Sequence, residues 1–121
     1  MKATSTLDTL GPVDTEERAD CTVWATAVCL GIPYTEAHRR LSAVGRKRGR
    51  GVRWSKVAPK LGFQAHPEFS CRLLRSILPE LRGRFIVRKA RHVFVVIDGQ
   101  ILDRFEVNPN CRVQMVYSCA A

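Results

Sequence analysis

The chain has 121 residues, 45% of them hydrophobic, which is enough for one domain with a real core and leaves little room for a second. No apolar run approaches the ~20 residues that a membrane span needs, and the N-terminal residues 1–20 lack the apolar segment of a secretory signal. The five cysteines form no CxxC pair and no Cys/His cluster. This pattern predicts a cytoplasmic protein with reduced thiols and no membrane partner, and it implies no metal or organic cofactor.

The charge is strongly basic. Twenty Lys and Arg residues oppose eleven Asp and Glu residues, giving a net charge of +9, and fifteen of the twenty are Arg. Residues 39–60 alone contain nine basic side chains and no acidic one. Such a charge attracts nucleic acid, an acidic protein or an anionic surface; the alternative is an arginine-rich surface that only keeps the protein soluble.

The chain begins with small and polar residues. We therefore expect residues 1–19 to be a flexible lead-in and residues 20–121 to form a single domain. Asp is a common N-cap residue and Gly commonly ends a helix, so Asp20 and Gly31 predict a helix over 21–30. Its apolar residues recur at spacings of three and four, which is typical of a buried helix.

Three further helices are predicted before residue 80. Each has, at or near its start, a side chain that commonly caps a helix, and each ends near Gly or Pro. They cover 36–44 after Thr35, 54–61 with Ser55 as the cap, and 71–78 after Ser70. Between the first two lies the glycine- and arginine-rich segment 45–51, which we expect to lie outside the core.

The remainder of the chain has the composition of strands. Four short runs are predicted as strands, at 84–88, 92–97, 100–103 and 112–117. The run 92–97 is nearly all β-branched or aromatic, 100–103 is the returning strand of its hairpin, and 112–117 alternates between apolar and polar residues. Asp98-Gly99 is a strong signal for a two-residue hairpin turn, and Asn108-Pro109-Asn110 predicts another turn. Helices followed by an antiparallel meander indicate an α+β fold, with N-terminal helices packed on a small C-terminal antiparallel β-sheet.

Three side chains suit nucleophilic catalysis by a thiol, which needs a thiolate, an imidazole and a group that orients the imidazole. Cys21 opens the first helix, where the positive end of the helix dipole favours the thiolate. His92 opens a hairpin strand, and the register set by the Asp98-Gly99 turn places it diagonal to Asp103 on the same face. Asp98 itself lies in the turn, and its simplest role is turn chemistry.

This arrangement resembles the papain-like cysteine peptidase superfamily, and in particular small bacterial and phage proteins with that fold. The resemblance covers about residues 20–117 and is carried by two stretches, 20–51 and 83–103. It implies Cys21 as the nucleophile, His92 as the general base and then acid, and Asp103 as the orienting residue. It also implies hydrolysis or transfer of an acyl group through a Cys21 thioester, with an amide or isopeptide bond of a protein or peptide as the target.

The sequence departs from that family in one respect. Papain-type enzymes usually carry a Gln or Asn shortly before the Cys to complete the oxyanion hole, and residues 1–20 contain neither. The backbone N–H of Cys21 supplies one donor, and Thr15 and Thr22 are candidates for the second. Loss of one such donor typically costs ~10²–10³ in rate. The alternative is therefore a weak or inactive papain-like module that uses its basic surface to bind nucleic acid or an acidic protein partner.

The basic segment after the second helix is either a solvated charge run or a recognition loop beside the active site. In the second case it favours acidic substrate segments or nucleic acid. Its candidate binding residues are Arg46, Lys47, Arg48, Arg50, Arg53 and Trp54. We expect the other four cysteines, Cys29, Cys71, Cys111 and Cys119, to be small buried residues, and we expect His38 and His66 to lie at the surface.

Overall fold

The computed structural model describes residues 9–13, 20–47, 49–50 and 52–119, which form an α+β fold with a five-stranded antiparallel sheet in the order β1-β5-β2-β3-β4. The strands are β1 (Phe63–Ala65), β2 (Arg84–Lys89), β3 (His92–Ile97), β4 (Gln100–Leu102) and β5 (Met115–Cys119). The α-helices are α2 (Cys21–Leu30), α3 (Tyr34–Ala43), α4 (Trp54–Val57) and α5 (Leu74–Ile77). Three short 3₁₀ helices are η1 (Pro59–Leu61), η2 (Pro67–Phe69) and η3 (Leu78–Glu80).

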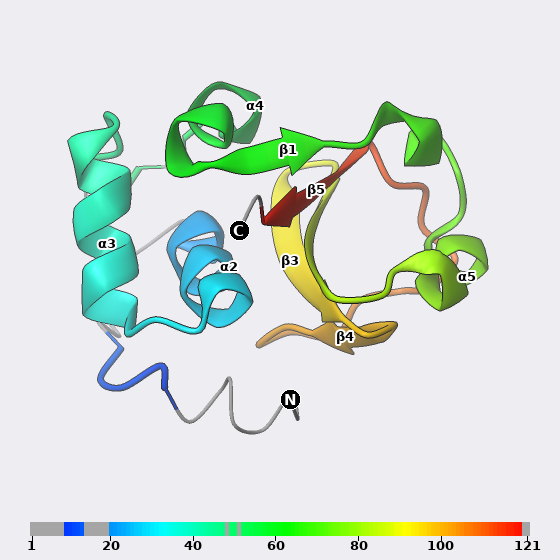
Figure 1. Ribbon diagram of the computed structural model, residues 1–121, viewed down its shortest axis with the longest axis horizontal. Helices are drawn as coiled ribbons and strands as arrows, with labels where there is room; N and C mark the ends of the chain where they lie inside the picture. The colour runs from blue at the N-terminus through cyan, green and yellow to red at the C-terminus, as the bar shows by residue number, and fades with distance from the viewer. Residues whose placement is uncertain (1–8, 14–19, 48, 51, 120–121) are drawn as a thin grey trace.

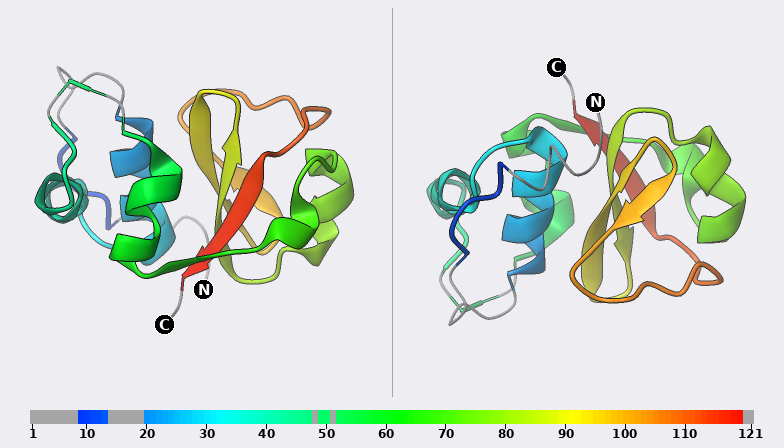
Figure 2. Two further views of the ribbon diagram at one scale, coloured as in Figure 1. Left: turned by 90° about the horizontal axis from the view of Figure 1, so that it is seen from above. Right: turned by 90° about the horizontal axis from the view of Figure 1, so that it is seen from below.

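Helices cover both faces of the sheet. In Figures 1 and 2, α2 lies between α3 and the sheet, and α5 lies on the opposite face. Alternate residues of β3 serve the two faces: Val93 and Val95 belong to the apolar cluster with α2, whereas Phe94 and Val96 belong to the cluster with α5. This explains the nearly continuous apolar run in β3, because a strand that is buried on both faces needs no polar side.

The predicted helix over 21–30 is confirmed as α2. Gly31 ends it in the left-handed conformation, with φ of 67°. The predicted capping role of Asp20 is wrong, because its side chain makes no capping hydrogen bond. The carboxylate instead accepts a hydrogen bond from the Tyr34 hydroxyl at 2.9 Å and pairs with Arg104. Asp20 is therefore a tertiary link at the start of α2.

The predicted hairpin register is confirmed at the three pairs that the structure contains, from Ile97 with Gln100 to Val95 with Leu102. Asp98 and Gly99 both have positive φ, 49° and 79°, as a type I′ turn requires. Asp98 lies in the turn, as predicted, with the positive φ that the turn needs. Its Oδ1 also accepts a hydrogen bond from the backbone N–H of Gly83 at 2.8 Å, which ties the turn to the segment before β2.

Several helix predictions were wrong in their bounds or caps. The helix predicted at 36–44 begins earlier, at Tyr34, after Pro33. The stretch 54–61 divides into α4 and η1, and Ser55 does not cap it. The helix predicted from Cys71 shrinks to α5, because Cys71 has a φ of 67° that a helix excludes. Ser70 donates its hydroxyl to the backbone of Gln114 and so is held by the far strand segment.

The last strand and the sheet order also differ from the prediction. Residues 112–117 were predicted as the strand, but β5 begins three residues later, and Arg112 forms only an isolated bridge with Leu73. β5 inserts between β1 and β2, so only β2, β3 and β4 form a meander. β1 comes from the helical half of the chain. These pairings are long-range, and no local sequence pattern specifies them.

Part of the predicted flexible lead-in, 1–19, contacts the domain. Leu10 and Val13 pack against the cluster around α2, and the Leu10 carbonyl accepts a hydrogen bond from Tyr34 N at 2.7 Å. Residues 1–8 and 14–19 lie outside the described residues. Among the helices that the structure describes, none has the length and apolar character to cross a membrane.

The remaining cysteines and histidines fall in mixed environments. Cys29 is buried as predicted, but Cys71 is exposed, which corrects the prediction for that residue. Cys111 and Cys119 are half-buried. His38 and His66, which were predicted at the surface, are both only partly exposed. The Nε2 atom of His66 forms a hydrogen bond with the Ser118 hydroxyl at 2.6 Å. This contact gives His66 a structural role between β5 and the loop that follows β1.

Candidate active site

Cys21 is the first residue of α2 and is partly buried. The first helical hydrogen bond runs from Trp24 N to Asp20 O at 2.9 Å. The N–H of Cys21 therefore precedes the helical ladder and has no acceptor within the helix. Together with the positive end of the helix dipole, this N–H provides an environment that stabilises negative charge at the thiol or beside it.

His92 and Asp103 are in direct contact, as the register predicts. His92 Nε2 lies 2.5 Å from Asp103 Oδ2, and the aspartate side chain is only 4% exposed. Asp103 Oδ1 accepts the backbone N–H of Arg104 at 2.8 Å, which fixes the carboxylate. The imidazole also stacks on Phe94, with ring centroids 6.1 Å apart and planes at 23°. With Nε2 on Asp103, Nδ1 is the nitrogen left for the thiol.

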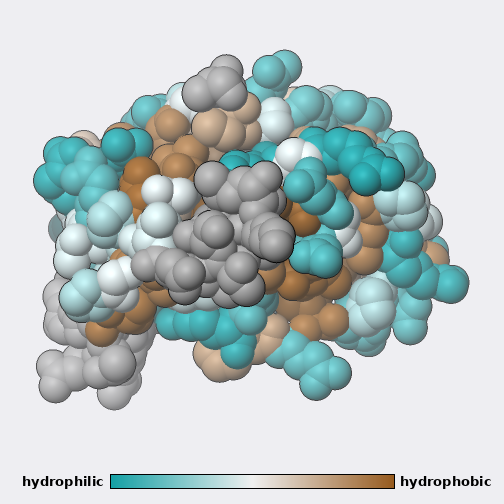
Figure 3. All heavy atoms as spheres, turned by 60° about the horizontal axis from the view of Figure 1, so that its bottom comes forward, coloured by the Kyte–Doolittle hydropathy of each residue, from teal (hydrophilic) through white to brown (hydrophobic). Residues whose placement is uncertain are grey.

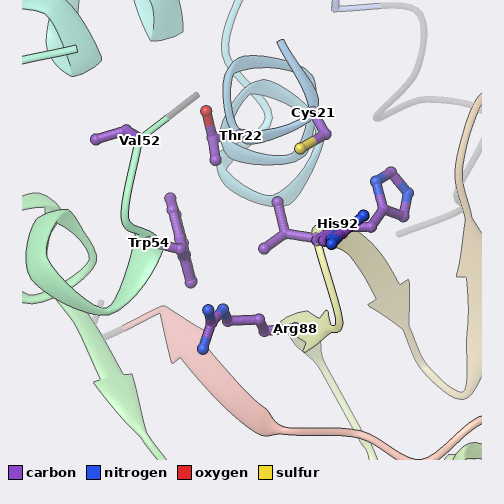
Figure 4. A pocket seen from close by; sticks show the side chains of 8 residues that line it. Cys21, Thr22, Val52, Trp54, Arg88 and His92 are labelled. Atoms are coloured by element: carbon purple, nitrogen blue, oxygen red, sulfur yellow. The ribbon is translucent and has the colours of Figure 1, made fainter. Parts of the chain in front are cut away.

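The thiol and the imidazole perturb each other in the manner of an ion pair. Burial raises the pKa of Cys21, but the hydrogen bond with His92 and backbone hydrogen bonds with Val93 and Thr22 outweigh it, so the pKa is lowered overall. The hydrogen bond with Asp103, followed by that with Cys21, raises the pKa of His92 to about 9. Both directions favour thiolate beside imidazolium at neutral pH. Figure 4 shows the His92 ring beside Cys21.

A partly buried ion pair joins the two halves of this arrangement. Arg104 Nη2 lies 2.7 Å from Asp20 Oδ1, and its Nη1 lies 3.3 Å from Oδ2. The guanidinium also lies over the Trp24 ring, 5.8 Å from its centroid. Since Asp20 directly precedes Cys21 and Arg104 directly follows Asp103, this clasp ties the start of α2 to the segment after β4.

A pocket of about 300 Å³ opens beside Cys21. Its lining combines an apolar wall with two arginines next to the thiol and the imidazole. The lining residues are Cys21, Thr22, Val52, Trp54, Arg88, Arg91, His92 and Val93. In Figure 4 the Cys21 sulfur points toward the space that Trp54 and Arg88 border. A substrate group in this pocket therefore lies next to the sulfur.

The predicted binding residues differ in burial and in whether they line the pocket. Trp54 is buried, packs edge-on against Tyr117 and lines the pocket. Arg46 was predicted to lie in an exposed loop, but its side chain is buried at 3% exposure, which contradicts the prediction. Its backbone N–H closes the end of α3 on the Leu41 carbonyl at 2.9 Å, and this folds the residue inward. Lys47, Arg50 and Arg53 are exposed and do not line the pocket, and Arg48 lies outside the described residues.

Sequence reasoning missed three charged residues of the site. Arg88 and Arg91 had a usable signal, because a two-residue turn at 90–91 pairs Lys89 with His92 and so brings both arginines to the end of the hairpin that carries the histidine. No local sequence signal points to Arg104, because its partner Asp20 lies 84 positions away in the chain. Ion pairs over such separations depend on the finished fold.

The structure places only one of the two candidates for the second oxyanion donor. Thr22 lines the pocket, and its hydroxyl is buried with no hydrogen-bond partner among the described residues. Thr15, the other candidate, lies outside them. The N–H of Cys21 is the donor that the geometry of α2 supplies directly.

The site's own side chains define its chemistry, which is that of an activated thiol with an oriented imidazole. In the part of the chain that the structure describes, no group of three or more His, Cys, Asp or Glu side chains is arranged to hold a metal ion. Comparisons of the chain with protein-family models, with curated proteins and with solved structures found no match.

Proposed function

We propose that this protein is a papain-like cysteine peptidase, or a related thiol hydrolase or acyltransferase, that acts on an amide or isopeptide bond of a peptide or protein. The observation that carries the proposal is a single imidazole that contacts both partners of a triad. His92 binds Asp103 at 2.5 Å through Nε2 and hydrogen-bonds the Cys21 thiol at the mouth of a pocket. Each residue takes the role that the resemblance implies.

The reaction proceeds in two halves. The Cys21 thiolate attacks the carbonyl carbon, and the oxygen of the tetrahedral intermediate accepts a hydrogen bond from the N–H of Cys21. The imidazolium of His92 gives its proton to the leaving amine, the C–N bond breaks, and a Cys21 thioester remains. Neutral His92 then takes a proton from water or an acceptor amine, which attacks the thioester. The acyl group leaves on that nucleophile, and Cys21 is released as the thiolate. The proton stays on His92, so the thiolate–imidazolium pair is restored.

An activated ester tests this proposal without knowledge of the substrate. We expect p-nitrophenyl acetate to release p-nitrophenolate while an acetyl group appears on Cys21, as peptide mapping by mass spectrometry would show. Cys71 is an exposed thiol and provides an internal reference. Acetylation of Cys21 should exceed that of Cys71 by at least about tenfold, because only Cys21 has the imidazole. Equal acetylation of the two thiols, or unchanged release in Cys21→Ala, would refute the proposal.

The exposed charges support a second candidate function, in which the fold binds an acidic partner or nucleic acid. Lys47, Arg50 and Arg53 are exposed, and the last two flank Val52, which lines the pocket. In Figure 3, hydrophilic residues gather along the upper and right edges of the face, with hydrophobic residues between them. Binding of a labelled oligonucleotide that weakens steeply with salt, and that Lys47→Gln/Arg50→Gln/Arg53→Gln reduces, supports this function. Absence of binding at low salt rules out nucleic acid.

A further inference from the structure

The active-site pocket contains two arginines that the proposed chemistry does not use. Arg88 stands near the end of β2, and Arg91 lies in the turn that leads into β3. The register pairs Arg88 with Val93 and Lys89 with His92. Both arginines are therefore fixed by the same hairpin that positions the imidazole, and both line the pocket into which the Cys21 sulfur points.

Neither arginine is engaged by a carboxylate among the residues that the structure describes. Three other arginines of the chain do pair with a carboxylate: Arg39 with Glu36, Arg72 with Glu80, and Arg104 with Asp20. Arg88 is half-buried, and Arg91 is exposed. Two cationic side chains with no carboxylate partner in the described part of the chain therefore provide charged donors for an anionic group of a substrate that enters this pocket.

The backbone at Arg91 gives independent support. Its φ of 62° is a left-handed conformation that non-glycine residues rarely adopt and that glycine adopts readily. The described backbone shows this conformation at only two other non-glycine positions, Cys71 and Asp98. Arg91 lies in a tight turn, where glycine would adopt this conformation without strain, so the presence of an arginine there agrees with a role for its side chain.

Apart from the two arginines, Cys21, Thr22 and His92, the pocket lining is apolar. Val52, Trp54 and Val93 line it, so it suits a short aliphatic stem with a charged end. In Figure 4 the Arg88 side chain extends along the pocket below Trp54. We propose that Arg88 and Arg91 bind a carboxylate on the acyl part of the substrate, which makes the enzyme selective for an acidic residue beside the bond that it attacks.

This inference rests on the proposed function, since it assigns the substrate class of the same site. The carboxylate has two sources, the side chain of a glutamate or aspartate, or a free carboxylate close to the attacked carbonyl. Arginine suits either one, because its planar guanidinium donates two parallel hydrogen bonds to a carboxylate.

The test compares the rates at which Cys21 reacts with pairs of electrophilic probes, one anionic and one neutral in each pair. One arm compares N-acetyl-Glu-Gly and N-acetyl-Gly-Glu vinyl sulfones with their glutamine counterparts, which reports a side-chain carboxylate. The other arm compares iodoacetate with iodoacetamide, which reports a free carboxylate. Peptide mapping gives the rate at Cys21 for each probe. The variants are Arg88→Gln/Arg91→Gln and, as a control of equal charge, Arg75→Gln/Arg82→Gln, whose side chains are exposed and lie outside the pocket.

We expect the acidic member of at least one probe pair to label wild-type Cys21 faster by about tenfold, as one charge-assisted contact allows. That ratio should fall toward one in Arg88→Gln/Arg91→Gln and persist in the control. A wild-type ratio near one in both arms, or an equal fall in both double variants, would overturn the inference alone. If iodoacetamide labels Cys21 no faster than Cys71, the proposed function fails as well.

Discussion

At the scale of single residues, His92 determines what the site can do. It contacts Asp103 on one side and Cys21 on the other, and these contacts raise its pKa to about 9 while the pKa of Cys21 is lowered. An imidazole without these partners titrates near 6.5 and leaves the thiol protonated at neutral pH. The two hydrogen bonds therefore favour the thiolate form of Cys21, which is the form that the proposed reaction needs.

The raised pKa of His92 predicts a pH-dependent stability. A raised pKa means that the folded state holds the proton more tightly, so this contribution is full below pH 6.5 and is lost as the pH rises toward 9. The comparison is made between Cys21→Ala and Cys21→Ala/His92→Gln, so that the thiol does not titrate. Urea unfolding should show the single variant more stable at pH 6, with a difference that shrinks by pH 10. A difference that grows with pH would contradict the assigned contact.

At the scale of elements, the clasp between Asp20 and Arg104 holds α2 against the segment that follows β4. Asp20 is buried and has two partners, the Arg104 guanidinium and the Tyr34 hydroxyl. The proposed catalytic residues lie next to the clasp in the chain, Cys21 beside Asp20 and Asp103 beside Arg104. We therefore expect loss of the clasp to disturb the placement of the thiol relative to the imidazole.

We predict that Arg104→Met lowers both stability and the reactivity of Cys21. Loss of the guanidinium leaves Asp20 buried with one neutral partner, which costs about 1–3 kcal/mol in the free energy of unfolding. The matched control is Arg39→Met, because Arg39 pairs with Glu36 at the surface and exposed pairs contribute ~1 kcal/mol or less. Urea unfolding and alkylation rates at Cys21 measure the two effects. Equal losses in both variants would show that the clasp has no special role.

The turn between β2 and β3 supports a second prediction at this scale. Arg91 has a φ of 62°, which is unfavourable for any residue with a Cβ. Arg91→Gly should therefore be more stable than Arg91→Ala by about 1 kcal/mol, although both remove the guanidinium. Urea unfolding of the two variants measures the difference. The opposite order would mean that Arg91 does not hold the left-handed conformation in solution.

At the scale of the whole molecule, the sheet separates two apolar clusters. The cluster with α2 supports the site, and the cluster with α5 lies on the other face. Leu74 is fully buried in the second cluster, so Leu74→Ala should lower the free energy of unfolding by about 2–5 kcal/mol. Under conditions where the variant stays folded, Cys21 should keep its alkylation rate. A loss of reactivity that exceeds the unfolded fraction would show that the two faces are coupled.

The sequence was most informative where the structure is local. The helix of Cys21, with its stop at Gly31, follows from apolar spacing and the terminal glycine. The Asp98-Gly99 turn and the contact of His92 with Asp103 follow from turn chemistry and hairpin register. Features that depend on distant partners could not be predicted in this way. Among them are the insertion of β5 beside β1, the burial of Arg46 and the pairing of Arg104 with Asp20.

The most direct test of the account is the pH dependence of the rate at which iodoacetamide alkylates Cys21. The wild-type rate should rise with a midpoint below that of an ordinary thiol, because His92 stabilises the thiolate. In His92→Gln the midpoint should move up toward the ordinary value of about 8.5. Cys71, an exposed thiol measured in the same samples, provides the internal reference. A wild-type midpoint equal to that of His92→Gln would contradict the claim that Cys21 and His92 form a catalytic pair.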